Sequence, residues 1–240
     1  MKKALLLLLA FLAGIILARA QEPVLYIPAE EMPDLLAILP APPDTASMDF
    51  TNDILRYMWG KNQRKDAARA AIADRDAIWD LDTLATIFSE PFGMKISKEG
   101  TPDIYRVFVN GIETIGEPRF RPKAHYNRIR PFVYFNEELM TPWEEYMIRY
   151  EGSYPSGHTM RGWSAAMILT AINPAAATAL FARAWMYGES RVIVGAHWQS
   201  DVDASRPAAS IGFAYLQTCP AFQEQLEKAR KEFKRLTRPE

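Results

Sequence analysis

The segment GSYPSGHTMRGWSAAMILTAI, at residues 152–172, holds a proline-containing turn followed by an apolar helical pattern. Across 159–172 the apolar residues recur at spacings of three and four, which predicts an α-helix. Ser156 and Gly157 come just before this helix, where their backbone N–H groups and the helix N-terminus can face an anion. An N-cap followed by a simple turn explains the same two residues, and both interpretations can hold together.

The rest of the chain shows the same helical periodicity. Pro102, Pro142 and Pro174 stand where the first turn of a helix tolerates proline, and no segment shows the alternation or the β-branched density of a sheet. The sequence therefore predicts an all-α fold, a single-domain helical bundle. The other predicted helices span 48–60, 64–79, 82–89, 102–125, 142–150, 174–194, 200–217 and 221–236.

One residue conflicts with this helical pattern. Pro207 lies inside the predicted helix at 200–217, where it lacks a backbone donor and crowds the carbonyl of Asp203. We therefore expect a kink or a helix break near Ala204.

The first twenty residues have the form of a secretory signal peptide. Lys2 and Lys3 precede a nearly unbroken apolar run at 4–17, and the small residues Ala18 and Ala20 suit cleavage directly after this segment. The run is shorter than the roughly 20 apolar residues that a spanning helix needs. An uncleaved membrane anchor is the alternative, but we expect an exported protein with no membrane attachment after cleavage.

The remaining chain, 21–240, is short enough for one hydrophobic core, and no Gly/Ser-rich linker divides it. Its proline-rich start, 21–45, predicts an extended N-terminal arm without helix or strand, lying on one all-helical domain at 46–240. Without the three basic residues of the signal segment, the 28 Lys and Arg fall to 25 against 29 Asp and Glu. This balance argues against nucleic-acid binding.

Cys219 is the only cysteine, so no internal disulfide can form, and we expect a buried, inert thiol.

Three groups of polar residues have constrained spacings. They are Lys123 with Arg130 and Pro131 (K-x6-R-P), Pro155 to His158 (P-S-G-H), and Ser190, Arg191, His197 and Asp201 (S-R-x5-H-x3-D). A single histidine or arginine says little, but the order and spacing of all three groups make coincidence negligible. His197 and Asp201 are four residues apart, which lets a carboxylate reach an imidazole nitrogen at a helix start and fix its tautomer.

Together these motifs resemble the signature of the phosphatidic acid phosphatase type 2 superfamily, which includes vanadium haloperoxidases and bacterial acid phosphatases. The longer strings at 152–159 and 197–203 are similar to those of class A bacterial non-specific acid phosphatases. The resemblance extends into the arm, at 26–28 and 39–43, and so covers essentially the whole chain after the signal segment. It implies the all-α fold of this superfamily, a periplasmic location and hydrolysis of phosphate monoesters.

The resemblance also implies a role for each motif residue. His197 attacks phosphorus and forms a phosphohistidine, and Asp201 supports it as in a Ser-His-Asp triad. His158 is the general acid that protonates the leaving group, which requires a neutral His197 and a protonated His158 in a window near pH 6.5 and predicts a bell-shaped, mildly acidic optimum. The phosphate-binding residues are Lys123, Arg130, Ser156, Gly157 and Arg191, which supply positive charge and N–H donors without a metal or other cofactor. Tyr154 and Trp198 flank catalytic residues and are expected at the pocket rim.

Several alternatives remain open at this point. A vanadium haloperoxidase uses the same site, but its chains are generally much longer, and an integral-membrane lipid phosphatase needs spanning segments that the sequence lacks after residue 17. A non-catalytic phosphate-binding protein would not need both His158 and His197. Within the phosphatase interpretation, the substrates are nucleotides, sugar phosphates or aryl phosphates, with nucleotide diphosphohydrolase specificity as a further alternative. The resemblance also implies inhibition by vanadate and a homodimer or larger assembly.

Overall fold

The computed structural model describes residues 23–238, so the predicted signal peptide at 1–20 lies outside the described residues. Every regular element in the described range is helical, which confirms the all-α class. The α-helices are α2 (Leu35–Ile38), α3 (Met48–Gln63), α4 (Ala67–Asp76), α5 (Leu81–Phe92), α6 (Pro102–Gly116), α7 (Phe120–Tyr126), α8 (Pro131–Tyr134), α9 (Pro142–Ile148), α10 (Gly157–Ile172), α11 (Ala177–Val194), α12 (Gln199–Leu216) and α13 (Pro220–Leu236). The 3-10 helices are η1 (Ala29–Glu31), η2 (Glu117–Arg119) and η3 (Pro174–Ala176). None of these helices is long and apolar enough to cross a membrane.

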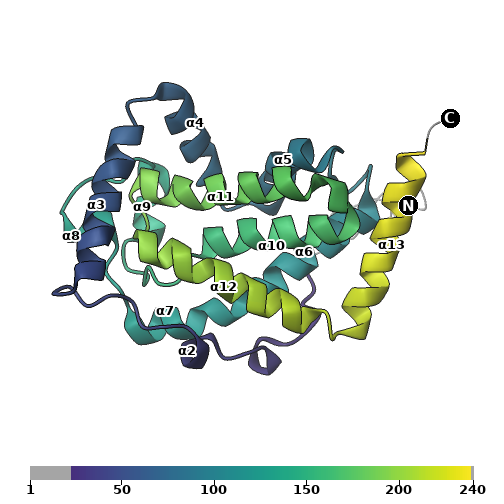
Figure 1. Cartoon of the computed structure of the whole chain (residues 1–240), viewed down its shortest axis with the longest axis horizontal. Helices are drawn as coiled ribbons and strands as arrows, with labels where there is room; N and C mark the ends of the chain where they lie inside the picture. The colour runs from purple at the N-terminus through teal and green to yellow at the C-terminus, as the bar shows by residue number, and fades with distance from the viewer. Residues whose placement is uncertain (1–22, 239–240) are drawn as a thin grey trace, which may run out of the picture.

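Helix α10, the helix of the segment quoted first, is the centre of the bundle (Figure 1) and packs against α6, α11 and α12. Its buried residues, among them Met160, Ala165 and Leu169, lie all around the helix, as expected of a core helix with no solvent face. Gly162 allows α11 to approach closely, because a Cβ there would lie 2.6 Å from Cδ1 of Tyr187. Helix α13 packs on α6 at the end of the bundle opposite α3 (Figure 1).

The turn between α11 and α12 brings two motif residues to one end of the bundle. Helix α11 stops at Val194 because Gly195 has a φ of 90°, a left-handed conformation that glycine adopts without steric cost. Trp198 is the N-cap of α12, and its backbone N–H donates to the Asp201 carboxylate at 2.9 Å. The start of α10 meets α12 here, since Ser156 N–H donates to the Asp201 carbonyl at 3.3 Å. The site therefore forms where the N-termini of α10 and α12 meet.

The single helix predicted at 102–125 is wrong in one respect, because the chain divides there into α6, η2 and α7. Pro118 and Pro122 each lack a backbone N–H, so a continuous ladder of hydrogen bonds cannot pass through this segment. Arg119 lies in η2 and Lys123 in α7, so both follow the end of α6. Helix α8, directly after Arg130, was not predicted.

Of the kink or helix break expected near Ala204, the break does not occur, because α12 runs without interruption from Gln199 to Leu216 with Pro207 inside it. Pro207 and Asp203 both lie on the exposed face of α12, so water can satisfy the carbonyl that proline leaves without a donor. The opposite face, including Ala208 and Ala209, is fully buried and holds the helix in place.

The N-terminal arm contains two short helices, η1 and α2, so the prediction that 21–45 forms no helix is wrong. Asp34 accounts for the start of α2, because its carboxylate caps the helix by accepting a hydrogen bond from Leu36 N–H at 3.1 Å. The preceding residues run along α6, where Val24 N–H donates to Asn110 Oδ1 at 3.1 Å. Leu35 and Leu39 are buried in the main core.

Candidate active site

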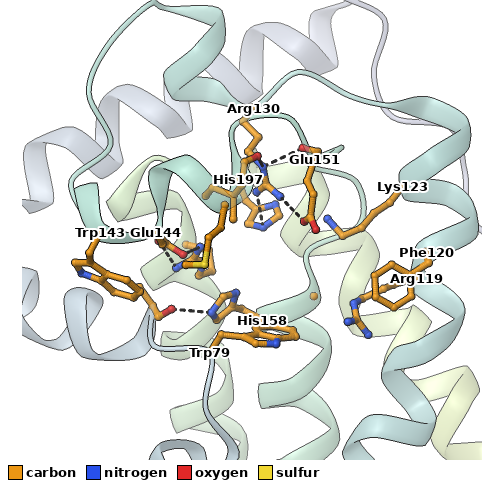
Figure 2. A pocket seen from close by; sticks show the side chains of 15 residues that line it. Trp79, Arg119, Phe120, Lys123, Arg130, Trp143, Glu144, Glu151, His158 and His197 are labelled. Atoms are coloured by element: carbon orange, nitrogen blue, oxygen red, sulfur yellow. Dashed lines mark hydrogen bonds and ion pairs between the residues drawn. The ribbon is translucent and has the colours of Figure 1, made fainter.

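A pocket of about 310 Å³ opens at the end of the bundle where α10 and α12 begin (Figure 2). This volume is at the small end of the range for ligand sites. Six of the residues singled out in the sequence line it, namely Lys123, Arg130, Gly157, His158, Arg191 and His197. They come from three segments that are well separated along the chain, and Figure 2 shows His197 and His158 facing one common space.

His197 is held in one tautomer by its two neighbours. Arg130 Nη1 lies 3.2 Å from His197 Nε2, and a guanidinium can only donate, so Nε2 must be unprotonated. The proton is then on Nδ1, which donates to Asp201 Oδ2 at 3.3 Å. Burial, Arg130 and Lys123 hold the pKa of His197 well below its usual value of 6.5. The ring is therefore neutral, with a lone pair on Nε2, well into the acid range.

Asp201 is itself fixed by a second, largely buried layer of side chains that was not predicted. Arg128 pairs with the other carboxylate oxygen of Asp201 and with Asp53, whose Oδ2 lies 2.7 Å from Arg128 Nη2. Asp53 also accepts from Ser200 N–H at 2.8 Å, which ties α3 to the first turn of α12. Arg128 stands two residues before Arg130 in the first motif, and this position is the one signal in the sequence that pointed to it.

His158 is the second residue of α10 and is only 6% exposed. Its Nε2 lies 3.0 Å from the Ala77 carbonyl, which can only accept, so Nε2 carries a proton and Nδ1 is left for other partners. Burial, Arg191 and His197 lower the pKa of His158 well below 6.5. The lowered pKa values favour neutral rings on both histidines in the free protein, which argues against the expectation of a protonated His158 near pH 6.5.

Three buried cations surround the two histidines. Lys123, Arg130 and Arg191 are 9%, 2% and 1% exposed. Burial and then Arg130 lower the pKa of Lys123 to about 7, while burial and then Arg191 lower the pKa of Arg130 to about 10. Backbone carbonyls hold the first two in place: Lys123 Nζ donates to Gly152 at 2.6 Å, and Arg130 Nη1 donates to Ala196 at 3.0 Å. So much positive charge in a closed space favours an anionic ligand.

Arg191 has a partner that sequence reasoning missed. Glu144 of α9, itself 2% exposed, accepts from both Nη atoms of Arg191 at 3.0 and 2.9 Å. The Arg191 Nε is also buried, and it has no hydrogen-bond partner among the described residues. A buried guanidinium N–H without an acceptor is costly unless a ligand supplies one.

Ser156 and Gly157, the two residues before His158, differ in their position relative to the pocket. Ser156 is the N-cap of α10, where its Oγ accepts from Thr159 N–H at 3.3 Å, and its own N–H is engaged by Asp201. Ser156 does not line the pocket, so the prediction that its backbone N–H binds the anion does not agree with this geometry. Gly157 does line the pocket, and a Cβ there would lie 3.2 Å from Arg119 Nε. Only the glycine therefore leaves room for a close approach to the helix start.

The prediction that Tyr154 and Trp198 line the pocket rim is wrong. Both are 1% exposed and lie outside the pocket. Tyr154 donates to the Pro40 carbonyl of the arm, and Trp198 packs against Phe50 with its Nε1 donating to Ile129 at 2.8 Å. Both side chains are close in sequence to motif residues but lie in the interior and not at the pocket. The aromatic side chains at the rim come instead from Trp79, Phe120 and Trp143.

The region that carries all three motifs matches a known family. The model of the PAP2 superfamily matches residues 107–226. The chain belongs to the PAP2 superfamily. Its PAP2 region runs from the middle of α6 into α13 and contains Lys123, His158, His197 and the acid partner Asp201.

Curated relatives of this PAP2 protein span most of its length. It is 40% identical over 212 residues to the non-specific acid phosphatase of Providencia stuartii, covering 88% of this chain and 85% of the relative. It is 41% identical over 195 residues to the non-specific acid phosphatase of Salmonella typhi, covering 81% and 78%. An acid phosphatase of Zymomonas mobilis is 33% identical over 202 residues, covering 84% and 76%. The PAP2 protein is thus similar to bacterial acid phosphatases, in agreement with the resemblance of its motifs.

Proposed function

We propose that this chain hydrolyses phosphate monoesters by forming a phosphohistidine on His197 and then releasing phosphate to water. One observation carries the proposal. The His197 imidazole has a lone pair on Nε2 and lies among three buried cations, and no single anion balances all three positive charges. The relatives named non-specific acid phosphatase support the same activity.

In the first step, the Nε2 lone pair of His197 attacks phosphorus as the bond from phosphorus to the ester oxygen breaks. Arg130 exchanges its contact with Nε2 for an oxygen of the phosphoryl group. Lys123 and Arg191 stabilise the charge on the other oxygens, and the free Nε of Arg191 gains an acceptor. Asp201 keeps the Nδ1 proton in place and stabilises the positive charge that develops on the ring.

The leaving alkoxide takes a proton from His158. Its free-enzyme pKa is low, so this proton has to arrive with the substrate. A phosphate monoester has its second pKa near about 6, so in mild acid it enters as a monoanion and can transfer its proton to Nδ1 of His158. The added negative charge then stabilises the imidazolium. In the second step the neutral His158 takes a proton from water, the hydroxide attacks phosphorus, and the bond from phosphorus to Nε2 breaks to restore His197.

The positive field of Lys123, Arg130 and Arg191 supplies the charge stabilisation for which other phosphatases use a metal ion, so we propose a metal-independent reaction. Activity toward AMP and a sugar phosphate is expected to be the same with and without EDTA. The same panel with ADP and ATP measures whether the chain also acts as a diphosphohydrolase. Activity that EDTA removes and Mg²⁺ or Zn²⁺ restores would contradict the proposal, as would oxidation of bromide by vanadate and peroxide without ester hydrolysis.

Anion binding is expected to weaken as the pH rises through about 7, where the buried Lys123 loses its proton. The lowered pKa means that the charged, binding-competent form exists below this pH and is lost above it. Sulfate is a suitable competitive inhibitor because it stays a dianion throughout this range, and its inhibition constant should rise at least about tenfold between pH 6 and pH 9. The Lys123→Arg variant keeps its charge and should show a nearly flat profile. An equal rise in both proteins would contradict this assignment.

For the cellular setting, we propose export to the periplasm with removal of residues 1–20, a broad range of monoester substrates, inhibition by vanadate and a homodimeric or larger assembly. The apolar run at 4–17 supports export. Vanadate becomes five-coordinate and trigonal bipyramidal when a nucleophile such as His197 Nε2 binds it, which resembles the transition state of phosphoryl transfer. Its negative charge also suits the cation-lined pocket, and both properties support inhibition.

A further inference from the structure

Large apolar side chains that the phosphoryl-transfer steps do not use gather at the mouth of the pocket. Trp79, Phe120, Trp143 and Met147 all line it, and they are 41%, 48%, 48% and 60% exposed. They come from three places in the fold: the link between α4 and α5, the start of α7, and α9. Half-exposed aromatic side chains converging on one pocket mark a binding surface more often than chance exposure does.

Trp79 is the best placed of these side chains, because its ring centroid lies 4.6 Å from that of His158 in an edge-to-face arrangement. Figure 2 shows the indole directly beside His158. The ester oxygen of a bound substrate must lie within hydrogen-bonding reach of His158, about 3 Å away. A group attached to that oxygen therefore comes to lie against Trp79.

The indole of Trp79 is also held rigidly. The Arg161 guanidinium stacks over it with Cζ 3.3 Å from the ring centroid, and Arg161 is fixed in turn by an ion pair with Glu113. A rigid aromatic side chain binds with little loss of conformational entropy. Phe120 is stacked in the same way, with Arg119 Cζ 4.0 Å from its ring centroid.

We propose that Trp79, with Trp143 and Phe120, forms a subsite for a planar aromatic leaving group, so that aryl and arylmethyl phosphates are the preferred monoesters. This inference rests on the proposed function for the role of His158. Stacking on a preformed aromatic surface adds binding energy for a flat ring, whereas a polyol such as glycerol gains little from the same surface. Arg119 lies beside both Trp79 and Phe120, and its planar guanidinium extends the stacking surface.

The test compares benzyl phosphate with glycerol 1-phosphate, which both release a primary alkoxide, so differences in the chemical step cancel. In Trp79→Ala, kcat/KM is expected to fall about tenfold for benzyl phosphate, mostly through KM, and less than about threefold for glycerol 1-phosphate. Trp185→Ala is the matched control: Trp185 is 49% exposed and carries Arg206 Cζ 3.6 Å from its ring centroid, but it lies outside the pocket. It should leave both substrates unchanged.

Trp79 also contacts His158, so its removal could lower activity by disturbing that ring. An equal loss of kcat/KM on both substrates would overturn the subsite and leave Trp79 with a purely structural role. Trp143→Ala provides a second variant without that contact and should show a smaller loss with the same preference for benzyl phosphate.

Binding of benzylphosphonate and methylphosphonate, measured by calorimetry, does not depend on turnover. The wild-type protein should bind benzylphosphonate more tightly, and Trp79→Ala should remove most of that difference. Equal affinities in the wild-type protein would overturn the subsite, whereas a clear preference in a protein that hydrolyses neither ester would overturn the proposed function alone.

Discussion

Replacing His197 with alanine is expected to lower kcat for every phosphate monoester by at least about 10⁴-fold, because the reaction then has no nucleophile to form the covalent intermediate. The loss should not reflect unfolding, since Arg130 keeps its carbonyl partners and Asp201 keeps its ion pair with Arg128. The measurement is kcat with p-nitrophenyl phosphate, together with a circular dichroism spectrum that should match the wild-type protein.

His125→Ala is the matched control for this experiment. His125 lies on the exposed side of α7, outside the pocket, so its loss should leave kcat unchanged. Brief incubation with a ³²P-labelled ester and an alkaline quench should leave label on the wild-type protein and on His125→Ala, but none on His197→Ala. Label that persists on His197→Ala would show that another residue is the nucleophile.

The second large effect is expected for His158→Ala, and its size should depend on the leaving group. Glycerol 1-phosphate must release an alkoxide that needs a proton, so its kcat should fall about 10² to 10⁴-fold. The p-nitrophenolate anion leaves without protonation, so the fall for p-nitrophenyl phosphate should be less than about tenfold in the step that forms the intermediate. The rate of the initial burst of p-nitrophenol measures this step separately from hydrolysis of the intermediate.

The ratio between the two substrates is the decisive quantity for His158. An equal loss for both would mean that His158 positions other groups and does not donate the proton. The inhibition constant of sulfate provides a control for binding, since it should change little when an uncharged imidazole is removed.

The sequence identified the two histidines of the pocket and three of its cations, Lys123, Arg130 and Arg191, because these lie in motifs with fixed spacing. His197 and Asp201 meet across one helical turn, so their four-residue spacing was enough to predict the contact at 3.3 Å. Glu144 could not be predicted, since its pairing with Arg191 depends on how α9 folds back over α11, and no local pattern encodes that. The same is true of Asp53, which reaches Arg128 from α3.

Local reasoning also failed where two physical effects compete. Helical periodicity suggested one helix at 102–125, whereas the missing N–H groups of Pro118 and Pro122 divide it. At Pro207 the outcome was the reverse, because burial of the opposite face of α12 outweighs the loss of one exposed hydrogen bond. For Tyr154 and Trp198, adjacency to motif residues suggested the rim, but their large apolar surfaces are satisfied in the interior. Burial of this kind depends on tertiary contacts that the sequence alone did not reveal.

The ion pair between Glu144 and Arg191 has a consequence for the end of each reaction cycle. Three unopposed cations would retain inorganic phosphate long after hydrolysis, and its slow departure would limit turnover. The buried Glu144 carboxylate neutralises the charge of Arg191, and the Glu151 carboxylate lies 3.6 Å from Arg130, so less positive charge is left to retain a phosphate dianion. Uniformly tighter binding of the product would slow its release without accelerating the chemistry. We therefore expect Glu144 to shorten the residence time of the product phosphate and to weaken inhibition by it.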